Sequence, residues 1–300
     1  MGAVLAEPRT LDKRFTGIVK CKEPLARHTS LRIGGSADVF VMPRTVDDIY
    51  EAICFAKESE KPWMVIGNGT NMLFPDTGYA GVIIKLGPWF GRLQVCQDTL
   101  YAQAGVNLRS AIMQARESGF RDFDMLVGIP GTIGGALAMN AGIPEGSICD
   151  LTTKVKALTS DGKLINLTKD ECNFSYRHSR FREETLVIVE GEFSLGKGKI
   201  WDGEELLRRR KVHQPLGIPS PGCVFKNPQS GVSAGQLIDR AGLKGTRVGG
   251  AAVSTKHANF IINEGGATSR DVLQLIDIVR GVVLKCFGIE LKLELAVVNS

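Results

Sequence analysis

The sequence predicts an α+β protein made of three consecutive blocks. Segments with a helical spacing of apolar residues alternate with short apolar runs that have the length of buried strands. Glycine-rich loops follow some of these runs, so that strand, loop and helix recur along the chain. With 300 residues the chain is long enough for two or three packed domains.

The first block, placed at residues 1–90, contains a helix at 45–57. Thr45 can cap this helix because Asp48 follows three residues later, as in a capping box. Two apolar runs predict buried strands at 63–67 and 81–86. The glycine-polar loop GNGTN separates them, so we expect a small unit in which a helix packs on strands.

The second block, placed at residues 91–200, mixes strands with one amphipathic helix. Asp161-Gly162 stands between two alternating runs and predicts a tight hairpin there. The predicted elements are a strand at 99–105, a helix at 107–119 that ends at Gly119, a hairpin at 154–167 and a strand at 185–195.

The third block, placed at residues 201–300, begins with a helix at 204–211 that Pro215 ends. In the terminal segment 291–298 apolar residues alternate, which leaves Glu294 on the opposite face of a predicted strand. Further predicted elements are helices at 233–242 and 269–288 and strands near 251–254 and 258–263.

Composition and charge exclude several classes of protein. The net charge of +5 suits anionic small molecules and is too diffuse to predict nucleic-acid binding. Seven scattered cysteines form no C-x-x-C pair, so neither a disulfide framework nor a metal site is predicted. No signal peptide, myristoylation pattern or membrane span is recognised. We therefore expect a cytoplasmic protein without membrane insertion.

The loop at 67–71 (Gly67, Asn68, Gly69, Thr70, Asn71) follows a strand, as phosphate-binding loops do. Glycine lets backbone N–H groups approach an anion closely. The loop matches neither the dinucleotide-binding fingerprint nor the P-loop. By itself it is better explained as a tight turn with left-handed residues.

A second loop, GIPGTIGGALAMNAG at 128–142, is harder to explain as a turn. Five glycines and three alanines leave little side-chain bulk, and ordering such a segment costs much backbone entropy. Contacts with a flat cofactor that carries a pyrophosphate would offset this entropy cost. Close packing of a helix on a sheet is the alternative, and two such loops in one chain favour the cofactor.

Other candidate residues are weaker when taken singly. Tyr176 precedes Arg177, whose guanidinium could hold a carboxylate or stabilise an enolate. The run RRRK at 208–211 is more typical of a solvated helix end than of a phosphate clamp. The stretch KHANFIIN at 256–263 fits ligand contacts and a satisfied strand edge equally well.

Cys223 in SPGCVFKNP admits four interpretations: buried filler, nucleophile, metal ligand or proton donor. The local sequence supplies no base for a nucleophile. The spacing C-x-x-K is similar to the S-x-x-K of penicillin-binding proteins, but their accompanying motifs are absent. From the local sequence alone, a structural cysteine ranks first.

Taken together, these motifs resemble the family of UDP-N-acetylenolpyruvoylglucosamine reductases, flavoenzymes of peptidoglycan precursor synthesis. The resemblance covers nearly the whole chain and rests on the order of its motifs. They are HTSLRIGGSADVF, VIGNGTNMLFPDTGYAGVII, GIPGTIGGALAMNAG, SYRHSRF, RRRKVHQP, GCVFKNP, VSTKHANFIIN and GIELKLE. It implies the FAD-binding fold of p-cresol methylhydroxylase-type flavoproteins, with two α+β subdomains that hold FAD and a C-terminal α+β substrate domain.

The resemblance also implies roles for individual residues. Arg177, Cys223 and Glu294 would be catalytic. FAD would be bound by Thr29, by Gly67, Asn68, Gly69, Thr70 and Asn71, and by Gly128, Pro130, Gly131, Thr132, Gly134, Gly135 and Asn140. The UDP-sugar substrate would contact Tyr176, Lys226, Asn227, Lys256, His257 and Asn259. No metal is implied, and we expect a monomer.

The reaction that the resemblance implies uses NADPH as the source of hydride for FAD. Hydride then passes to C3 of the enolpyruvyl group, and a proton goes to C2. Arg177 and Glu294 would stabilise the enolate-like charge, and Cys223 would donate the proton. Many family members carry serine at this position. An ordinary thiol pKa of about 8.5 makes Cys223 a better acid than an alcohol, whereas a pKa lowered by Lys226 would weaken its role as proton donor.

Two departures from the family pattern affect the pocket. GIPEGSICD replaces a Gly-Ala-Tyr-Gly stretch, and the chain lacks an inserted loop with a substrate-covering tyrosine, as in the shorter type of the family. Two rival functions remain open: another flavin oxidoreductase of this fold that acts on a hydroxy acid or sugar, and a non-catalytic nucleotide-sugar binder.

Overall fold

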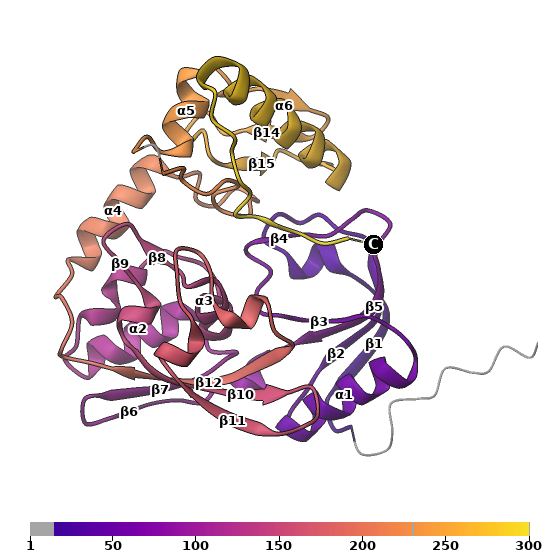
Figure 1. The fold of residues 1–300 in the computed structure, drawn as a ribbon, viewed down its shortest axis with the longest axis vertical. Coiled ribbons are helices and arrows are strands. Elements are labelled where there is room, and N and C mark those ends of the chain that lie inside the picture. The colour runs from indigo at the N-terminus through magenta and orange to yellow at the C-terminus, as the bar shows by residue number, and fades with distance from the viewer. Residues whose placement is uncertain (1–14, 230, 300) are drawn as a thin grey trace, which may run out of the picture.

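The first unit is a four-stranded sheet covered by one helix. The computed structural model describes residues 15–229 and 231–299 (Figure 1). Strand order is β1 (Ile18–Pro24), β2 (Ser36–Met42), β5 (Tyr79–Lys85) and β3 (Trp63–Ile66), with β1 antiparallel to β2 and the other pairs parallel. Helix α1 (Val46–Glu58) starts at Thr45, which forms the expected capping box with Asp48.

The second unit is a five-stranded antiparallel sheet with two helices. The order is β11 (Leu164–Thr168), β10 (Thr152–Thr159), β12 (Leu186–Ser194), β7 (Thr99–Gln103) and β6 (Leu93–Cys96), and the helices are α2 (Leu108–Glu117) and α3 (Ile133–Met139). The buried side chains of this unit and of α1 form one continuous core, so the first two units pack firmly together.

The third unit is attached through α4 (Gly203–His213), and its core also includes Leu31, Ile33 and Leu73 from the first unit. It contains α5 (Ala234–Arg240), α6 (Ser269–Phe287) and the small sheet β13 (Arg247–Val248), β14 (Ala251–Val253) and β15 (Ile261–Asn263). In Figure 1 the C-terminal segment runs from this unit back to the first. There β16 (Ala296–Val297) pairs in parallel with β4 (Met72–Leu73).

Short elements complete the described chain. They are the 3-10 turns η1 (Leu25–His28), η2 (Pro88–Phe90), η3 (Asp122–Leu126), η4 (Ile148–Asp150), η5 (Asp170–Cys172) and η6 (Arg180–Arg182), and the strands β8 (Gly142–Ile143) and β9 (Gly146–Ser147). Over the described ranges, no helix has both the length and the apolar character needed to cross a membrane.

The predicted elements are largely confirmed, although strands β1, β2 and β6 were not predicted and two predicted segments differ. The loop at 128–142 contains helix α3, which begins at Thr132 and ends at the left-handed residue Asn140. Glycine is a poor helix former, so packing and capping stabilise this helix rather than propensity. The predicted terminal strand shortens to Ala296–Val297, but its apolar face is buried as expected at Leu291 and Leu295.

Candidate active site

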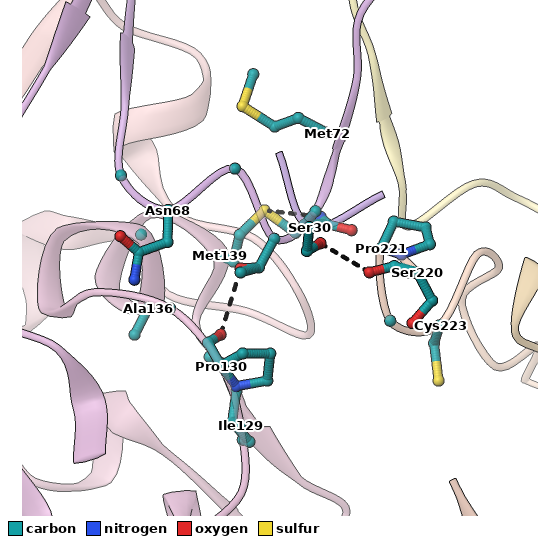
Figure 2. Close-up of a pocket in the computed structure, with 18 of the residues that line it drawn as sticks. Ser30, Asn68, Met72, Ile129, Pro130, Ala136, Met139, Ser220, Pro221 and Cys223 are labelled. Carbon is teal, nitrogen blue, oxygen red and sulfur yellow. Dashed lines mark hydrogen bonds between the residues drawn. The ribbon is translucent and has the colours of Figure 1, made fainter. Parts of the chain in front are cut away.

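A cavity of about 670 Å³ lies where the three units meet. Its size is within the range of small-molecule sites. Figure 2 shows Asn68 and Ala136 on one side, and Ser220, Pro221 and Cys223 on the other. The walls thus come from the loop after β3, from α3 and from the turn before Val224, segments that are far apart in the sequence.

The two glycine loops support one another and form one wall of the cavity. A Cβ added at Gly67 would lie 2.5 Å from the Oγ1 atom of Thr132, so only glycine permits this approach. The hydroxyl of Thr70 donates to the carbonyl of Pro130 at 3.3 Å, one of the dashed lines in Figure 2. Each loop therefore fixes the position of the other.

Arg177 and Glu294 form an ion pair at the cavity, with 3.0 Å between Nε and Oε1. Two further donors of the guanidinium are used: Nη2 contacts the carbonyl of Gly142 at 2.8 Å, and Nη1 that of Asn140 at 3.4 Å. Arg177 also has a left-handed φ of 54°, a conformation rare outside glycine. Its orientation is therefore set by several contacts at once.

The backbone around Glu294 connects the other parts of the site. Its N–H donates to the carbonyl of Val224 at 2.8 Å, which places it beside Cys223. Its own carbonyl accepts a 3.0 Å hydrogen bond from the side-chain amide of Asn71 in the first glycine loop. The acid, the thiol and the cofactor loop are thus linked through main-chain contacts.

Burial raises the pKa of two acidic groups at the site, the carboxyl of Glu294 and the thiol of Cys223. It raises the pKa of Glu294, and the charge of Arg177 opposes this shift. Burial, followed by the negative charge of Glu294, raises the pKa of Cys223 to about 12, while Arg177 and Arg210 act in the opposite direction. The expectation of an ordinary thiol pKa lowered by Lys226 is therefore wrong, because arginines and not this lysine oppose the burial of the thiol.

Asn259 holds the turn that carries Cys223. Its amide donates to the carbonyl of Phe225 at 2.8 Å and accepts from the N–H of the same residue at 2.9 Å. The side chain is buried, and its polar group weakly opposes the rise in the pKa of the Cys223 thiol. Asn259 thus lies behind the cavity wall, where it positions the thiol.

The structure brings most of the predicted cofactor and catalytic residues together. Those that line the cavity are Gly67, Asn68, Gly69, Thr70, Asn71, Gly128, Pro130, Gly131, Thr132, Gly135, Arg177, Cys223 and Glu294. The others lie outside its lining: Thr29, Gly134, Asn140, Tyr176, Lys226, Asn227, Lys256, His257 and Asn259. Thr29, for example, is buried and donates its hydroxyl to the carbonyl of Ile33.

Gly134 and Gly135 face different surroundings although they are adjacent in α3. A Cβ at Gly134 would lie 2.9 Å from the Cβ of Ala104 and 3.2 Å from its carbonyl oxygen. Close helix–sheet packing, the alternative left open above, accounts for this glycine. At Gly135 a Cβ would meet nothing closer than 3.6 Å, and this residue lines the cavity.

The predicted substrate residues make contacts with other parts of the protein. The hydroxyl of the exposed Tyr176 accepts from the N–H of Asn227 at 3.4 Å. The Nζ atom of Lys256 donates to the carbonyl of Lys211 at 2.5 Å. Burial lowers the pKa of His257, which would keep this imidazole neutral to lower pH.

Comparison with known proteins identifies the family. Residues 214–298 match the family model described as UDP-N-acetylenolpyruvoylglucosamine reductase, C-terminal domain, and residues 37–168 match the FAD binding domain. The reductase of Heliobacterium modesticaldum is 41% identical over 97% of this chain and 94% of its own length. This chain belongs to the UDP-N-acetylenolpyruvoylglucosamine reductase family. The reductase of Syntrophomonas wolfei is 39% identical over 94% of the chain and 95% of its own.

A solved structure supports the same assignment. The crystal structure of the reductase from Thermus caldophilus superposes with a TM-score of 0.77 at 34% identity, over 95% of this chain and 100% of that chain. The predicted family, the α+β fold and its FAD-binding part are therefore confirmed. The chain is a member of a flavin-dependent reductase family, with FAD as the cofactor.

The cavity fits such a flavin cofactor. Gly131 and Gly135 line it, and a Cβ at either position would meet nothing closer than 3.4 and 3.6 Å, so their missing side chains keep the space open. Lining side chains include apolar ones such as Ile66, Leu108 and Met139, as a planar ring system requires. Among the described residues, no group of histidine, cysteine or acidic side chains could hold a metal.

Sequence reasoning missed several residues that line the cavity: Ser30, Arg182, Arg210 and the segment 214–218. In the run RRRK, Arg208 and Arg209 are exposed and paired with Glu205, as predicted for a solvated helix end. Arg210 instead enters the cavity. Arg210 follows Leu207 by three residues, so the two side chains share one face of the helix, and both lie beside Gly128. This spacing is the signal that could have distinguished Arg210 from Arg208 and Arg209.

Proposed function

We propose that the protein reduces UDP-N-acetylglucosamine enolpyruvate to UDP-N-acetylmuramate with NADPH, in peptidoglycan precursor synthesis. Curated relatives at about 40% identity carry the name of this reductase. The observation that carries the proposal is the convergence of Arg177, Cys223 and Glu294 on one cavity lined by both glycine loops.

The cofactor would be held by the two glycine loops at 67–71 and 128–135. Their mutual contacts at Gly67 and Thr70 keep the backbone in place before the cofactor binds. The flavin, once reduced by NADPH, would supply the hydride that reaches C3 of the enolpyruvyl group. The remaining chemistry falls to side chains of this chain.

Arg177 would stabilise the negative charge that builds on the substrate carboxylate. A guanidinium held by the carbonyls of Asn140 and Gly142 needs little reorganisation during the reaction. In the structure, the carboxylate of Glu294 accepts a hydrogen bond from Nε of Arg177. Burial raises the pKa of this carboxyl, and in its protonated form Glu294 could donate a hydrogen bond to the developing enolate.

Cys223 would donate the proton to C2. With a pKa of about 12 the thiol is fully protonated at neutral pH and remains a stronger acid than an alcohol. The thiolate left after transfer would be stabilised by Arg177 and Arg210, whose charges favour the ionised form. Asn259 keeps the thiol in position through its bonds to Phe225.

The proposal is tested by separating the two half-reactions under anaerobic conditions. NADPH should bleach the bound flavin, and addition of UDP-N-acetylglucosamine enolpyruvate should restore its absorbance rapidly. A flavin that bleaches and then stays reduced would exclude this substrate and favour another oxidoreductase of the same fold. Repeating the bleaching step with NADH tests the choice of nicotinamide.

A further inference from the structure

Arg210 occupies a position that the proposed mechanism leaves largely unused. It lies in the last turn of α4, lines the cavity, and its Cδ atom would be 2.8 Å from a Cβ at Gly128. The two preceding arginines are different. Arg208 and Arg209 are exposed and share the carboxylate of Glu205 at 2.6 and 2.7 Å.

The guanidinium of Arg210 lacks a protein partner. Within residues 15–229 and 231–299, none forms a hydrogen bond or an ion pair with it. Arg177, in contrast, already donates to a carboxylate and two carbonyls, and Arg182 donates to the carbonyl of Arg177 at 3.3 Å. Arg210 is therefore the cavity arginine whose donors are all available to a ligand.

The surroundings of the Arg210 guanidinium favour the binding of an anion. The side chain is partly buried, and burial lowers its pKa because the desolvated charge is uncompensated. A desolvated guanidinium without a counter-charge is unfavourable, and a planar anion held by two parallel hydrogen bonds removes that penalty. Arg210 lines the same cavity as Cys223 and Arg177, and its charge favours the ionised form of the thiol, so an anion bound to Arg210 would lie near both residues.

We propose that Arg210 binds the carboxylate of the substrate's enolpyruvyl group, as a second cation beside Arg177. This inference rests on the proposed function. The carboxylate is attached to C2, the atom that receives the proton of Cys223, so a cation facing the thiol also faces this group. The diphosphate lies at the other end of the sugar. Since Nε of Arg177 is engaged with Glu294, a second guanidinium supplies the donors for a bidentate contact.

The test compares two ligands that differ in the carboxylate. UDP-N-acetylmuramate carries it on the lactyl group, and UDP-N-acetylglucosamine has the same diphosphate without it. Binding to the flavin-loaded protein is measured by calorimetry for wild type, Arg210→Met and Arg210→Lys. Arg208→Met is the matched control, because it removes a guanidinium from the same helix turn outside the cavity.

We expect Arg210→Met to weaken the binding of UDP-N-acetylmuramate by about 10-fold or more, as for loss of a charged hydrogen bond. The affinity for UDP-N-acetylglucosamine should stay within about two-fold of the wild-type value. Arg210→Lys should recover part of the lost affinity, and Arg208→Met should leave the affinity for both ligands unchanged. Flavin content and melting temperature of each variant are measured in parallel and should match wild type.

Three outcomes would overturn the inference. Equal weakening of both ligands would place Arg210 at the diphosphate. Loss of bound flavin in Arg210→Met would place it at the cofactor. Unchanged binding of both ligands would show that it binds neither anion. A wild-type protein that binds neither nucleotide sugar would instead contradict the proposed function, which keeps the two failures distinct.

Discussion

At Cys223 the fold keeps a thiol in its acid form. Serine and cysteine differ little in size, but a thiol ionises more readily, and an ordinary cysteine among arginines would become a thiolate. Here burial and Glu294 outweigh Arg177 and Arg210, and the pKa rises to about 12. The surroundings thus preserve the proton that the proposed reaction needs.

The first prediction separates proton donation from hydride supply. Cys223→Ser should keep substantial turnover, because a hydroxyl in the same place can still donate. Cys223→Ala should lower flavin reoxidation by the substrate about 10²-fold or more, as for loss of a general acid, without changing flavin bleaching by NADPH. Stopped-flow absorbance measures both steps, and equal slowing of the two would remove the donor role.

The second prediction concerns pH. Burial raises the pKa of Cys223 to about 12, so protonation favours the folded state. This contribution to stability is complete below the unfolded pKa and is lost as pH rises through the folded one. Flavin reoxidation should therefore not slow between about pH 7 and 9 through loss of the thiol proton. A decline with an ordinary thiol pKa that disappears in Cys223→Ser would contradict this.

At the scale of elements, helix α3 shows how one glycine-rich segment serves two purposes. Its Gly134 side packs on the end of β7 next to Ala104, and its Gly135 side borders the cavity. The N–H of Gly134 also donates to the carbonyl of Ala104 at 2.9 Å. A short helix rich in glycine is stable here because both its ends and its packing are specified.

The third prediction uses these two adjacent glycines. Gly134→Val should destabilise the fold by about 1–3 kcal/mol, because the side chain overlaps the sheet. Gly135→Val should occupy the cavity and lower the flavin content with a smaller loss of stability. Both variants add the same β-branched residue to the same helix. Thermal melts of the apoprotein and flavin absorbance check them, and identical behaviour of the pair would contradict the assignment of faces.

At the scale of the whole molecule, the third unit is tied to the first by contacts distant in sequence. The carboxylate of Asp76 accepts from the N–H and hydroxyl of Ser269 at the start of α6. Ser30 donates to the carbonyl of Ser220 at 2.7 Å, as Figure 2 shows, and β16 pairs with β4. We propose three units with boundaries near residues 90 and 200, whose relative placement assembles the cavity.

The fourth prediction tests this link. Asp76→Ala should lower stability by about 1 kcal/mol and also slow flavin reoxidation, because the unit that carries Cys223 and Glu294 loses a contact with the first unit. Thr268→Ala removes the cap of the same helix without touching that link, and should lower stability alone. Melting temperature and stopped-flow rates distinguish the two variants. Equal rates of flavin reoxidation in Asp76→Ala and Thr268→Ala would show that the link does not position the site.

The sequence alone determined the features that depend on neighbours along the chain. The cap at Thr45, the strands at 63–67 and 81–86 and the glycine loops could be predicted because backbone propensity and apolar spacing act over a few residues. The order of the motifs also specified the family. Helix α3 was missed because its stability comes from packing against β7 rather than from its residues.

Only the tertiary structure decided how the residues of the site are brought together and how their charges interact. Arg177 and Glu294 are 117 residues apart in sequence and 3.0 Å apart in space. The pKa of Cys223 and the free donors of Arg210 depend on burial and on charges contributed by such distant segments. Electrostatic energies follow distance and desolvation in space, which local sequence patterns do not encode, so these properties exist only once the three units have come together.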